Sequence, residues 1–368
     1  MFVSWAVTHA VRRRAAKWGL VDQPGVRKVH TTPTPLGGGL AIWAGVVAPL
    51  AAGQLLLWLL LDGKSAGLSD FVAAIPVPEF VVPHLSGLWQ QSGKLWVLLA
   101  AGTLLMLLGL ADDLRGLPWR LRLGVQTALA AAIVTGEWRF TLFIDAPWLT
   151  GAVSVLWIVG LINSFNMLDN MDGLSSGIAA IAASLLAAVM LLAPDPLTRQ
   201  PQLFTGGFLL VLVGALLGFL WHNRPPAKIF MGDAGSYFIG FLLAMMTIIA
   251  TFAVGEAPKR HAILAPLCVL AVPLYDTITV VIIRLRAGKS PFEGDKNHFS
   301  HRLVDLGLTR TQAVLTIYLT TATTGLGALL LYQVDGLGAC IILLLVACVL
   351  TVIGILETTA RRKLRGVG

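Results

Sequence analysis

Long apolar runs separated by short polar segments make up most of this chain. A helix needs about 20 consecutive apolar residues to cross the hydrocarbon core of a bilayer. Ten runs near that length therefore predict membrane-spanning helices, and together they predict an all-α, polytopic transmembrane bundle forming one integral-membrane domain over residues 1–368. The runs fall at about 37–61, 95–111, 121–136, 151–166, 174–193, 203–221, 236–254, 262–284, 313–332 and 337–356.

A shorter apolar stretch, Met1 to Val11, precedes the first full run. Arg12, Arg13 and Arg14 follow it, which is the reverse of the charge order in a cleavable signal peptide. We expect the end of a helix whose first half is missing, because of an upstream start codon or a shortened span. Counting this truncated helix, the pattern predicts eleven crossings.

Composition agrees with a membrane solvent. Hydrophobic residues make up 56% of the 368 positions and charged residues 12%, whereas soluble domains carry roughly 45–50% and about 25%. The net charge of +8 raises the alternative of nucleic-acid binding. Lys and Arg occur in short clusters between apolar runs, however, which is how membrane proteins record their orientation. We therefore expect a lipid bilayer and no nucleic acid as the partner.

The basic residues are distributed unequally between the two sides of the predicted bundle. One side takes the segments 12–36, 112–120, 167–173, 222–235, 285–312 and 357–368. Together with the helix ends at Arg122 and Arg284, these segments hold 21 of the 27 Lys and Arg residues. The excess predicts that this side of a multi-pass membrane protein faces the cytosol.

The unusual polar residues all fall on this basic side. Because the orientation rests on Lys and Arg alone, the shared location of carboxylates and histidines independently predicts a cytosol-facing active site. Five clusters carry them, namely Lys28 to Gly39, Asp112-Asp113, Asn163 to Gly173, Phe230 to Ser236, and Asp295 to Arg302.

Asp112 and Asp113 end an apolar run. Two adjacent carboxylates beside hydrocarbon are costly unless a cation or a hydrogen-bond donor offsets them. A metal ion or a basic substrate group would do so. The alternative is a solvated helix end with Arg115 as the local partner.

Asn163, Asn166, Asp169 and Asp172 recur every three residues. On a helix, neighbours in such a series share a face, so two amides and two carboxylates predict an oxygen-rich site for Mg²⁺ and a diphosphate. Helix capping, the alternative, would explain one or two of the four.

The segment from Gly232 to Ser236 opens the next apolar run. Its glycines allow close backbone approach, and a helix N-terminus favours phosphate. Alternatively, Asp233 is an N-cap. His298 and His301 lie with Lys296 and Arg302 in a loop suited to phosphate oxygens, although two histidines together can also be incidental. Taken together, the clusters predict phosphoryl transfer involving a lipid.

With these motifs in this order, the chain resembles the polyprenyl-phosphate N-acetylhexosamine-1-phosphate transferases, relatives of the phospho-MurNAc-pentapeptide translocase. The resemblance runs from Gly19 to about Leu356. The positions that match the family's motifs are Lys28, His30, Pro33, Pro35 and Gly38, then Asp112 and Asp113, then Asn163, Asn166, Asp169, Asp172 and Gly173, then Gly232 to Ser236, and finally His298, His301 and Arg302.

Three positions depart from the family's pattern. Asn170 replaces the first glycine of the Asn-x-x-Asn-x-x-Asp-Gly-x-Asp-Gly signature, and Ser300 replaces the middle histidine of the last loop. Gly116 stands where the family often has a charged residue after the double aspartate. These departures bear on the sugar that is used, not on the type of reaction.

The resemblance implies a reaction and residue roles. At a bacterial inner membrane, undecaprenyl phosphate would attack the sugar-linked phosphorus of a UDP-sugar, with UDP-GlcNAc as the expected donor, and release UMP. The lipid-linked product would initiate a cell-envelope polysaccharide such as lipopolysaccharide or O-antigen. The resemblance also implies Mg²⁺, with Mn²⁺ as an alternative, held by Asp233 and Asn166. Asp112, Asp113, Asp169 and Asp172 would be catalytic, and the substrate-binding residues would be Lys28, His30, Asn163, Gly232, Ser236, His298, His301 and Arg302.

Two other functions remain open from the sequence. A transporter would place polar residues near the bilayer midplane, whereas here they cluster at one face. The second alternative is the activity of the related translocase on UDP-MurNAc-pentapeptide. By resemblance, the His-x-x-His-Arg loop favours the simpler N-acetylhexosamine over that substrate. The sequence also leaves the oligomeric state open, with a homodimer as one alternative.

Overall fold

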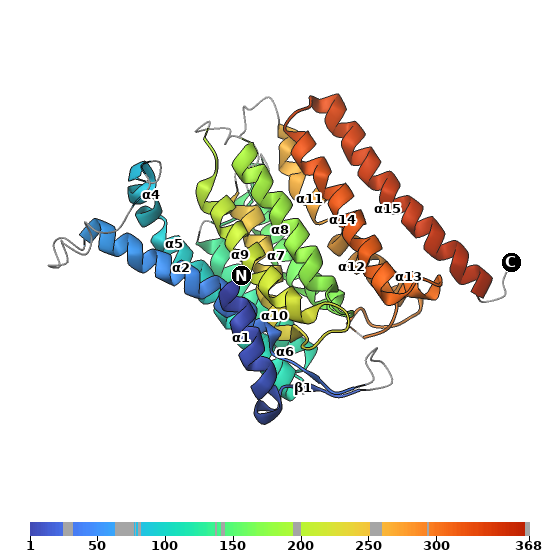
Figure 1. Ribbon diagram of the computed structural model, residues 1–368. Helices are drawn as coiled ribbons and strands as arrows, with labels where there is room; N and C mark the ends of the chain where they lie inside the picture. Colours follow the sequence, from blue (N-terminus) through green and yellow to red (C-terminus); the bar gives the residue numbers. More distant parts are fainter. Residues whose placement is uncertain are drawn as a thin grey trace.

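The computed structural model describes residues 1–24, 32–62, 77, 79, 82–136, 138–140, 144–193, 200–250, 260–292 and 294–364, and it is dominated by helices (Figure 1). A short antiparallel pair, β1 (Val21–Asp22) and β2 (Thr34–Pro35), lies near one end of the bundle. The helices are α1 (Phe2–Arg14), α2 (Gly38–Asp62), α4 (Leu85–Gln90), α5 (Ser92–Arg115), α6 (Trp119–Thr135), α7 (Pro147–Leu168), α8 (Leu174–Leu192), α9 (Leu203–Asn223), α10 (Gly232–Ile249), α11 (Ala265–Val269), α12 (Ala271–Arg286), α13 (Phe299–Asp305), α14 (Arg310–Leu331) and α15 (Gly336–Leu364), with short 3₁₀ turns at Ala15–Trp18, Val82–His84 and Arg260–Leu264.

The prediction of a polytopic helical bundle is confirmed. Among the described residues, eight helices are long and apolar enough to cross a membrane, namely α2, α5, α7, α8, α9, α10, α14 and α15. A ninth candidate is the bent pair formed by Arg260–Val269 and Ala271–Arg286. Every predicted run therefore has a helix, but α1 and α6, with 13 and 17 residues, are shorter than these spans.

The run at 262–284 is not one straight helix as predicted. Its two halves meet at Leu270 with a bend of 66°. Pro273 lies in the first turn of α12, where it has no backbone N–H to donate to the preceding turn. The interrupted hydrogen-bond ladder explains why the helix breaks here.

Helix α10 is the centre of the bundle, and α15 lies at its edge. In α10, 78% of the spanning residues are buried, against 11% in α15. Glycines bring the neighbouring helices against the start of α10. A side chain at Gly39 would come within 2.2 Å of the Gly235 backbone, and one at Gly109 within 2.4 Å of Asp233. Within the segment itself, a side chain at Gly235 would come within 3.0 Å of the Gly39 backbone, so this glycine serves helix packing.

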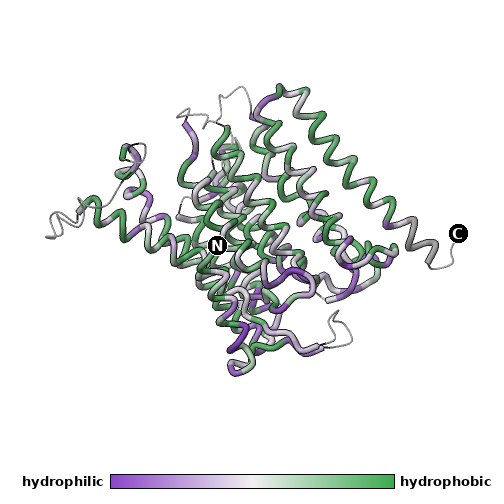
Figure 2. The backbone as a smooth tube through the Cα atoms, viewed as in Figure 1, coloured by the Kyte–Doolittle hydropathy of each residue, from purple (hydrophilic) through white to green (hydrophobic). Residues whose placement is uncertain are grey.

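This packing gathers four helix ends at one end of the molecule. Helices α5 and α7 finish there, whereas α10 and α13 begin there (Figure 1). Figure 2 shows hydrophilic segments concentrated at this end, while the bodies of the helices are mostly hydrophobic. The fold therefore brings polar segments from distant parts of the sequence into one place.

Candidate active site

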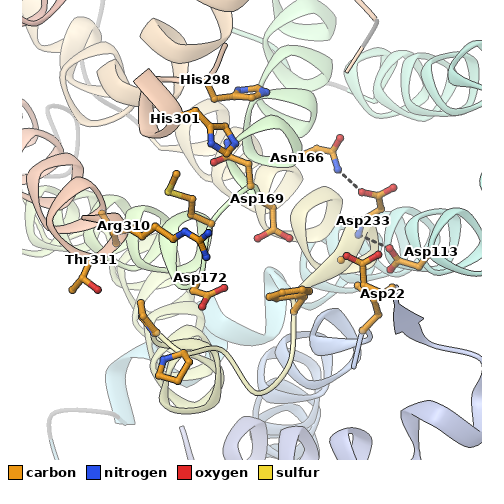
Figure 3. A pocket seen from close by; sticks show the side chains of 18 of the residues that line it. Asp22, Asp113, Asn166, Asp169, Asp172, Asp233, His298, His301, Arg310 and Thr311 are labelled. Atoms are coloured by element: carbon orange, nitrogen blue, oxygen red, sulfur yellow. Dashed lines mark hydrogen bonds between the residues drawn. The ribbon is translucent and has the colours of Figure 1, made fainter. Parts of the chain in front are cut away.

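A cavity of about 720 Å³ opens where these helix ends meet (Figure 3). Its polar lining comes from residues far apart in the chain, and it combines carboxylates with amides, two imidazoles and a guanidinium. These residues are Asp22, Asp113, Asn166, Asp169, Asn170, Asp172, Asp233, Asp295, His298, His301, Arg310 and Thr311, with the backbone of Gly232 beside them.

Asp113 fixes the start of α10. Its carboxylate accepts hydrogen bonds from the backbone N–H groups of Asp233 at 2.9 Å and Ala234 at 3.2 Å. These are amides that a helix leaves without internal partners. Asp113 therefore occupies the donors that the sequence assigned to a phosphate. The alternative of Asp233 as N-cap is also wrong, because Asp233 lies inside the first helical turn.

Asp112 does not line the cavity. It is buried, with 6% of its surface exposed, and it accepts hydrogen bonds from Arg122 at 2.5 Å, Leu117 N–H at 2.7 Å and Tyr237 Oη at 3.0 Å. The cation that offsets Asp112 is thus Arg122, and the alternative of a solvated helix end with Arg115 as partner is wrong for this residue.

Arg122 lies between the carboxylates of Asp112 and Asp233. Besides Asp112, it lies 3.6 Å from Asp233 Oδ2. A cation shared by two carboxylates reduces their mutual repulsion. Sequence reasoning used Arg122 only as a marker of orientation, and its position ten residues after Asp112, at the start of the next helix, gave no sign of this role.

Asn166 and Asp233 meet directly, as expected for residues of one site. Asn166 Nδ2 donates to Asp233 Oδ1 at 2.5 Å and to Ser236 Oγ at 3.1 Å. Ser236 itself is fully buried and lies outside the cavity lining, so its predicted contact with substrate is not what this arrangement offers. Among the described residues, no three His, Cys, Asp or Glu side chains converge as a ready metal cluster.

The proposed helical series beginning at Asn163 is only partly helical. Helix α7 ends at Leu168, so Asp169 and Asp172 lie in the turn that follows. Asn163 donates to Gln126 Oε1 at 2.7 Å and does not line the cavity. The spacing of three therefore does not place all four side chains on one helix face.

The turn nevertheless puts both carboxylates in the cavity wall. Asp172 Oδ2 accepts a hydrogen bond from Ala227 N–H at 2.9 Å, which attaches the turn to the segment after α9. Burial, reinforced by the negative charge of Asp113, raises the pKa of Asp169 to about 7. Negative charge accumulates here to a degree that favours a cation.

The segment from Asp295 to Arg302, called the histidine loop below, forms the opposite wall. Its last four residues are the start of α13. His298 and His301 both line the cavity, and their ring centroids are 6.3 Å apart. Burial lowers the pKa of His301, so this ring is neutral at pH 7 and can accept as well as donate a hydrogen bond.

Arg302 belongs to a different environment from the two histidines. Only 3% of it is exposed, it lies outside the cavity lining, and its Nε is 2.9 Å from Glu357 Oε2 of α15. The expected direct contact of Arg302 with substrate is therefore not what this arrangement offers. Arg302 instead anchors α13 to the last helix.

A second ion pair anchors the segment before the histidines. Asp295 accepts two hydrogen bonds of 3.2 Å from the guanidinium of Arg284. Although burial opposes ionisation, the hydrogen bonds from Arg284 and Asn297 lower the pKa of Asp295 to about 2. Asp295 therefore remains a carboxylate at the cavity edge at any physiological pH.

Three further residues of the site escaped the sequence analysis. Asp22 and Arg310 line the cavity, and Figure 3 shows Arg310 extending toward Asp172. Asp276 lies behind His298, at 2.9 Å from its Nδ1. Asp276 had a readable signal, because it is a lone carboxylate within a predicted membrane run, and such residues are rarely without function. Lys28 and His30 lie outside the described residues.

The described part of the chain is a multi-span helical membrane protein whose polar cavity lies at one end of the bundle. Comparison with known proteins identifies its family. The model of "Glycosyl transferase family 4" matches residues 95–251. The chain is 31% identical over 322 residues to a probable undecaprenyl-phosphate N-acetylglucosaminyl 1-phosphate transferase of Bacillus subtilis, which covers 85% of this chain and 77% of the relative.

Two other relatives agree. A decaprenyl-phosphate N-acetylglucosaminephosphotransferase of Mycolicibacterium smegmatis is 34% identical over 349 residues, covering 89% of this chain and 79% of that protein. An undecaprenyl-phosphate alpha-N-acetylglucosaminyl 1-phosphate transferase of Escherichia coli K12 is 26% identical over 330 residues, covering 84% and 76%. The chain thus belongs to glycosyl transferase family 4, and it is a transferase.

Proposed function

We propose that this enzyme transfers GlcNAc-1-phosphate from UDP-GlcNAc to undecaprenyl phosphate at the cytosolic face of a bacterial inner membrane. The observation that carries the proposal is the cavity itself, which joins carboxylates, imidazoles and a guanidinium at the end of a membrane bundle. A lipid-phosphate oxygen forms a bond to the sugar-linked phosphorus, and the bond from that phosphorus to the bridging oxygen breaks. UMP leaves with the bridging oxygen. The product would initiate a cell-envelope polysaccharide.

Mg²⁺ is the cofactor that these residues fit. Mg²⁺ takes oxygen ligands, and it is usually held by one or two carboxylates together with substrate phosphates and water instead of a complete protein cage. Asp233 and Asp169 would supply the carboxylates, and Asn166 would supply an amide oxygen once its side chain turns over. Burial and, after it, the charge of Asp113 raise the pKa of Asp169, and a bound cation would stabilise the ionised form of this carboxyl. When bound, Mg²⁺ neutralises charge that develops on the diphosphate.

The residues around this centre hold its geometry. Asp113 keeps the first turn of α10 in place through two backbone amides, and Arg122 holds Asp233 on one side while Asp112 holds Arg122. In this arrangement Asp112 acts through Arg122 and Asp233, and not as the base for the lipid phosphate. Catalysis of phosphoryl transfer depends mainly on such positioning and on electrostatic stabilisation.

The opposite wall suits the remaining parts of the substrate. His298, His301 and Arg310 line the cavity and would hold the diphosphate and the sugar. Arg310 is the only arginine or lysine among the described residues of the lining, so it is the natural partner for phosphate oxygens. Charge-assisted hydrogen bonds of this kind are roughly twice as strong as neutral ones.

The direct test supplies purified protein with undecaprenyl phosphate, Mg²⁺ and one radiolabelled UDP-sugar at a time. We expect a lipid-linked product and an equal amount of UMP from UDP-GlcNAc, and no product from UDP-MurNAc-pentapeptide. Asp335→Asn, an aspartate substitution in the α14–α15 turn, serves as the control for handling and folding. Reaction of the pentapeptide substrate alone would replace the proposal by the activity of the related translocase.

A further inference from the structure

Asp276 is a buried carboxylate directly behind the cavity wall. It lies in the first half of α12, and none of its surface is exposed. One carboxylate oxygen accepts the backbone N–H of Phe299 at 2.5 Å, and the other is 2.9 Å from His298 Nδ1. A buried carboxylate is costly unless such partners satisfy it. Both of its partners belong to the histidine loop, so the Asp276 side chain attaches that loop to α12.

The chemistry of the contact fixes the imidazole of His298. A carboxylate can only accept hydrogen bonds, so the proton of the contact must lie on Nδ1. Nε2 is then the ring nitrogen left for the cavity that His298 lines. There it can accept a hydrogen bond from a hydroxyl group, or donate one to a phosphate oxygen when the ring is protonated.

We propose that Asp276 is a positioning residue of the transfer reaction: it holds His298 with Nδ1 protonated and Nε2 presented to the substrate. The proposal rests on the function proposed above, because it assigns the substrate to the cavity. Asp276 does not touch the substrate and acts entirely through His298. An outer partner that fixes the tautomer of a site histidine commonly has a large effect on activity.

A purely structural role would be the simpler explanation, but the loop has other anchors. Arg302 binds Glu357 of α15, and Asp295 binds Arg284 of α12. Each of these ion pairs attaches the same loop to a membrane helix through side chains other than the His298 imidazole. Asp276 differs from both anchors because its second carboxylate oxygen accepts a hydrogen bond from the His298 imidazole.

The substitution Asp276→Asn separates the two roles. Phe299 N–H still requires an acceptor, so the amide oxygen of Asn must stay on that side. The amide NH₂ then faces His298 Nδ1 and donates to it, which moves the ring proton to Nε2. Asn therefore preserves volume and packing but imposes the opposite tautomer, whereas Ala removes packing and imposes none.

The experiment ranks Asp276→Asn and Asp276→Ala by activity and by thermal stability. We expect Asp276→Asn to lower kcat by about 10²- to 10⁴-fold, the range of acid–base and tautomer effects, and to be no more active than Asp276→Ala. Its melting temperature should nevertheless be the higher of the two. If Asn retains near-wild-type kcat and Ala does not, the role is structural and the proposal is wrong.

Two further measurements complete the test. In a His298→Gln background, Asp276→Asn should cause no further loss of kcat, because residues that act as a unit are not additive. The matched control Glu357→Gln removes another anchor of the loop, and its effect should remain fully additive with His298→Gln. Additive effects of Asp276→Asn would overturn the proposal.

A readout that needs no substrate separates this inference from the proposed function. In protein labelled with ¹⁵N-histidine, the His298 signals, assigned by their loss in His298→Gln, should report an Nδ1–H tautomer in wild type and an Nε2–H tautomer in Asp276→Asn. An unchanged tautomer would refute the inference even if the enzyme is active. The expected change would support the assigned geometry even if UDP-GlcNAc is not the substrate.

Discussion

Ser300 donates a hydrogen bond of 2.5 Å to the side-chain oxygen of Asn170, which lies 130 residues earlier in the chain. These are two of the three positions at which the sequence departs from the motifs of the transferases that it resembles. The usual residues there are a glycine and a histidine. In the folded protein the two departures are a contact pair that joins the turn after α7 to α13, so they should be understood together.

This pairing predicts non-additive substitutions. Ser300→His alone adds volume at a site with 1% exposure and removes the hydrogen bond, whereas Asn170→Gly alone leaves Ser300 without its partner. The double variant restores the family's residues and makes room. We expect a coupling of about 0.5–1.5 kcal/mol in unfolding free energy, the size of one hydrogen bond, measured by a double-mutant cycle. Ser300→His combined with the distant Asp335→Asn should instead be additive.

Metal dependence predicts the behaviour of Asp233→Asn. If Asp233 holds Mg²⁺, the variant should lose turnover by orders of magnitude while its melting temperature and elution profile stay close to wild type. EDTA should abolish wild-type activity, and added Mg²⁺ should restore it. Full activity in EDTA, or a wild-type rate in the variant, would contradict the assignment.

The raised pKa of Asp169 predicts how stability depends on pH. Its pKa is about 7 in the folded protein and about 3.9 in an unfolded chain. The folded state therefore holds this proton more tightly, and the stability it contributes is lost as pH rises from about 4 to about 7. In EDTA, Asp169→Asn should be increasingly more stable than wild type across this window, with a constant difference above it. Thermal unfolding from pH 5 to pH 8.5 measures this, and a pH-independent difference would contradict it.

The pattern of apolar residues in the sequence predicts some features of this site and not others. Apolar runs and the charges between them place helix ends on one side of the membrane, so it was predictable that Asn166, Asp233 and the two histidines would lie on the same side, where they line one cavity. Periodicity does not fix where a helix end turns its last side chains. Asp112 and Asp113 are adjacent, yet one faces Arg122 and the other faces the start of α10. Which of two neighbours points inward is decided by partners that no local pattern shows.

Arg302 and Arg310 illustrate the same limit and give opposite predictions. Arg302 is paired with Glu357 and lies outside the lining, whereas Arg310 lies in it. Arg310→Ala should raise the KM for the UDP-sugar with little loss of thermal stability. Arg302→Ala should lower the melting temperature, because it removes the cation from the buried Glu357 carboxylate, which keeps the hydrogen bond from Tyr275 Oη. Steady-state kinetics and thermal unfolding on both variants test this contrast, which fails if the two effects are exchanged.

The orientation of the protein is the last prediction. If the basic side faces the cytosol, so does the cavity, because α5 and α7 end there and α10 and α13 begin there. Lys94 lies near the start of α5, and Ser290 lies between α12 and α13; both are exposed. In a variant without Cys268, Cys340 and Cys348, we expect a membrane-impermeant maleimide to label Lys94→Cys in intact cells. Ser290→Cys should react only after permeabilisation. Labelling of Ser290→Cys from outside would place the cavity on the face that a cytosolic nucleotide sugar cannot reach, and it would exclude the proposed reaction at that site whatever the activity of the other variants.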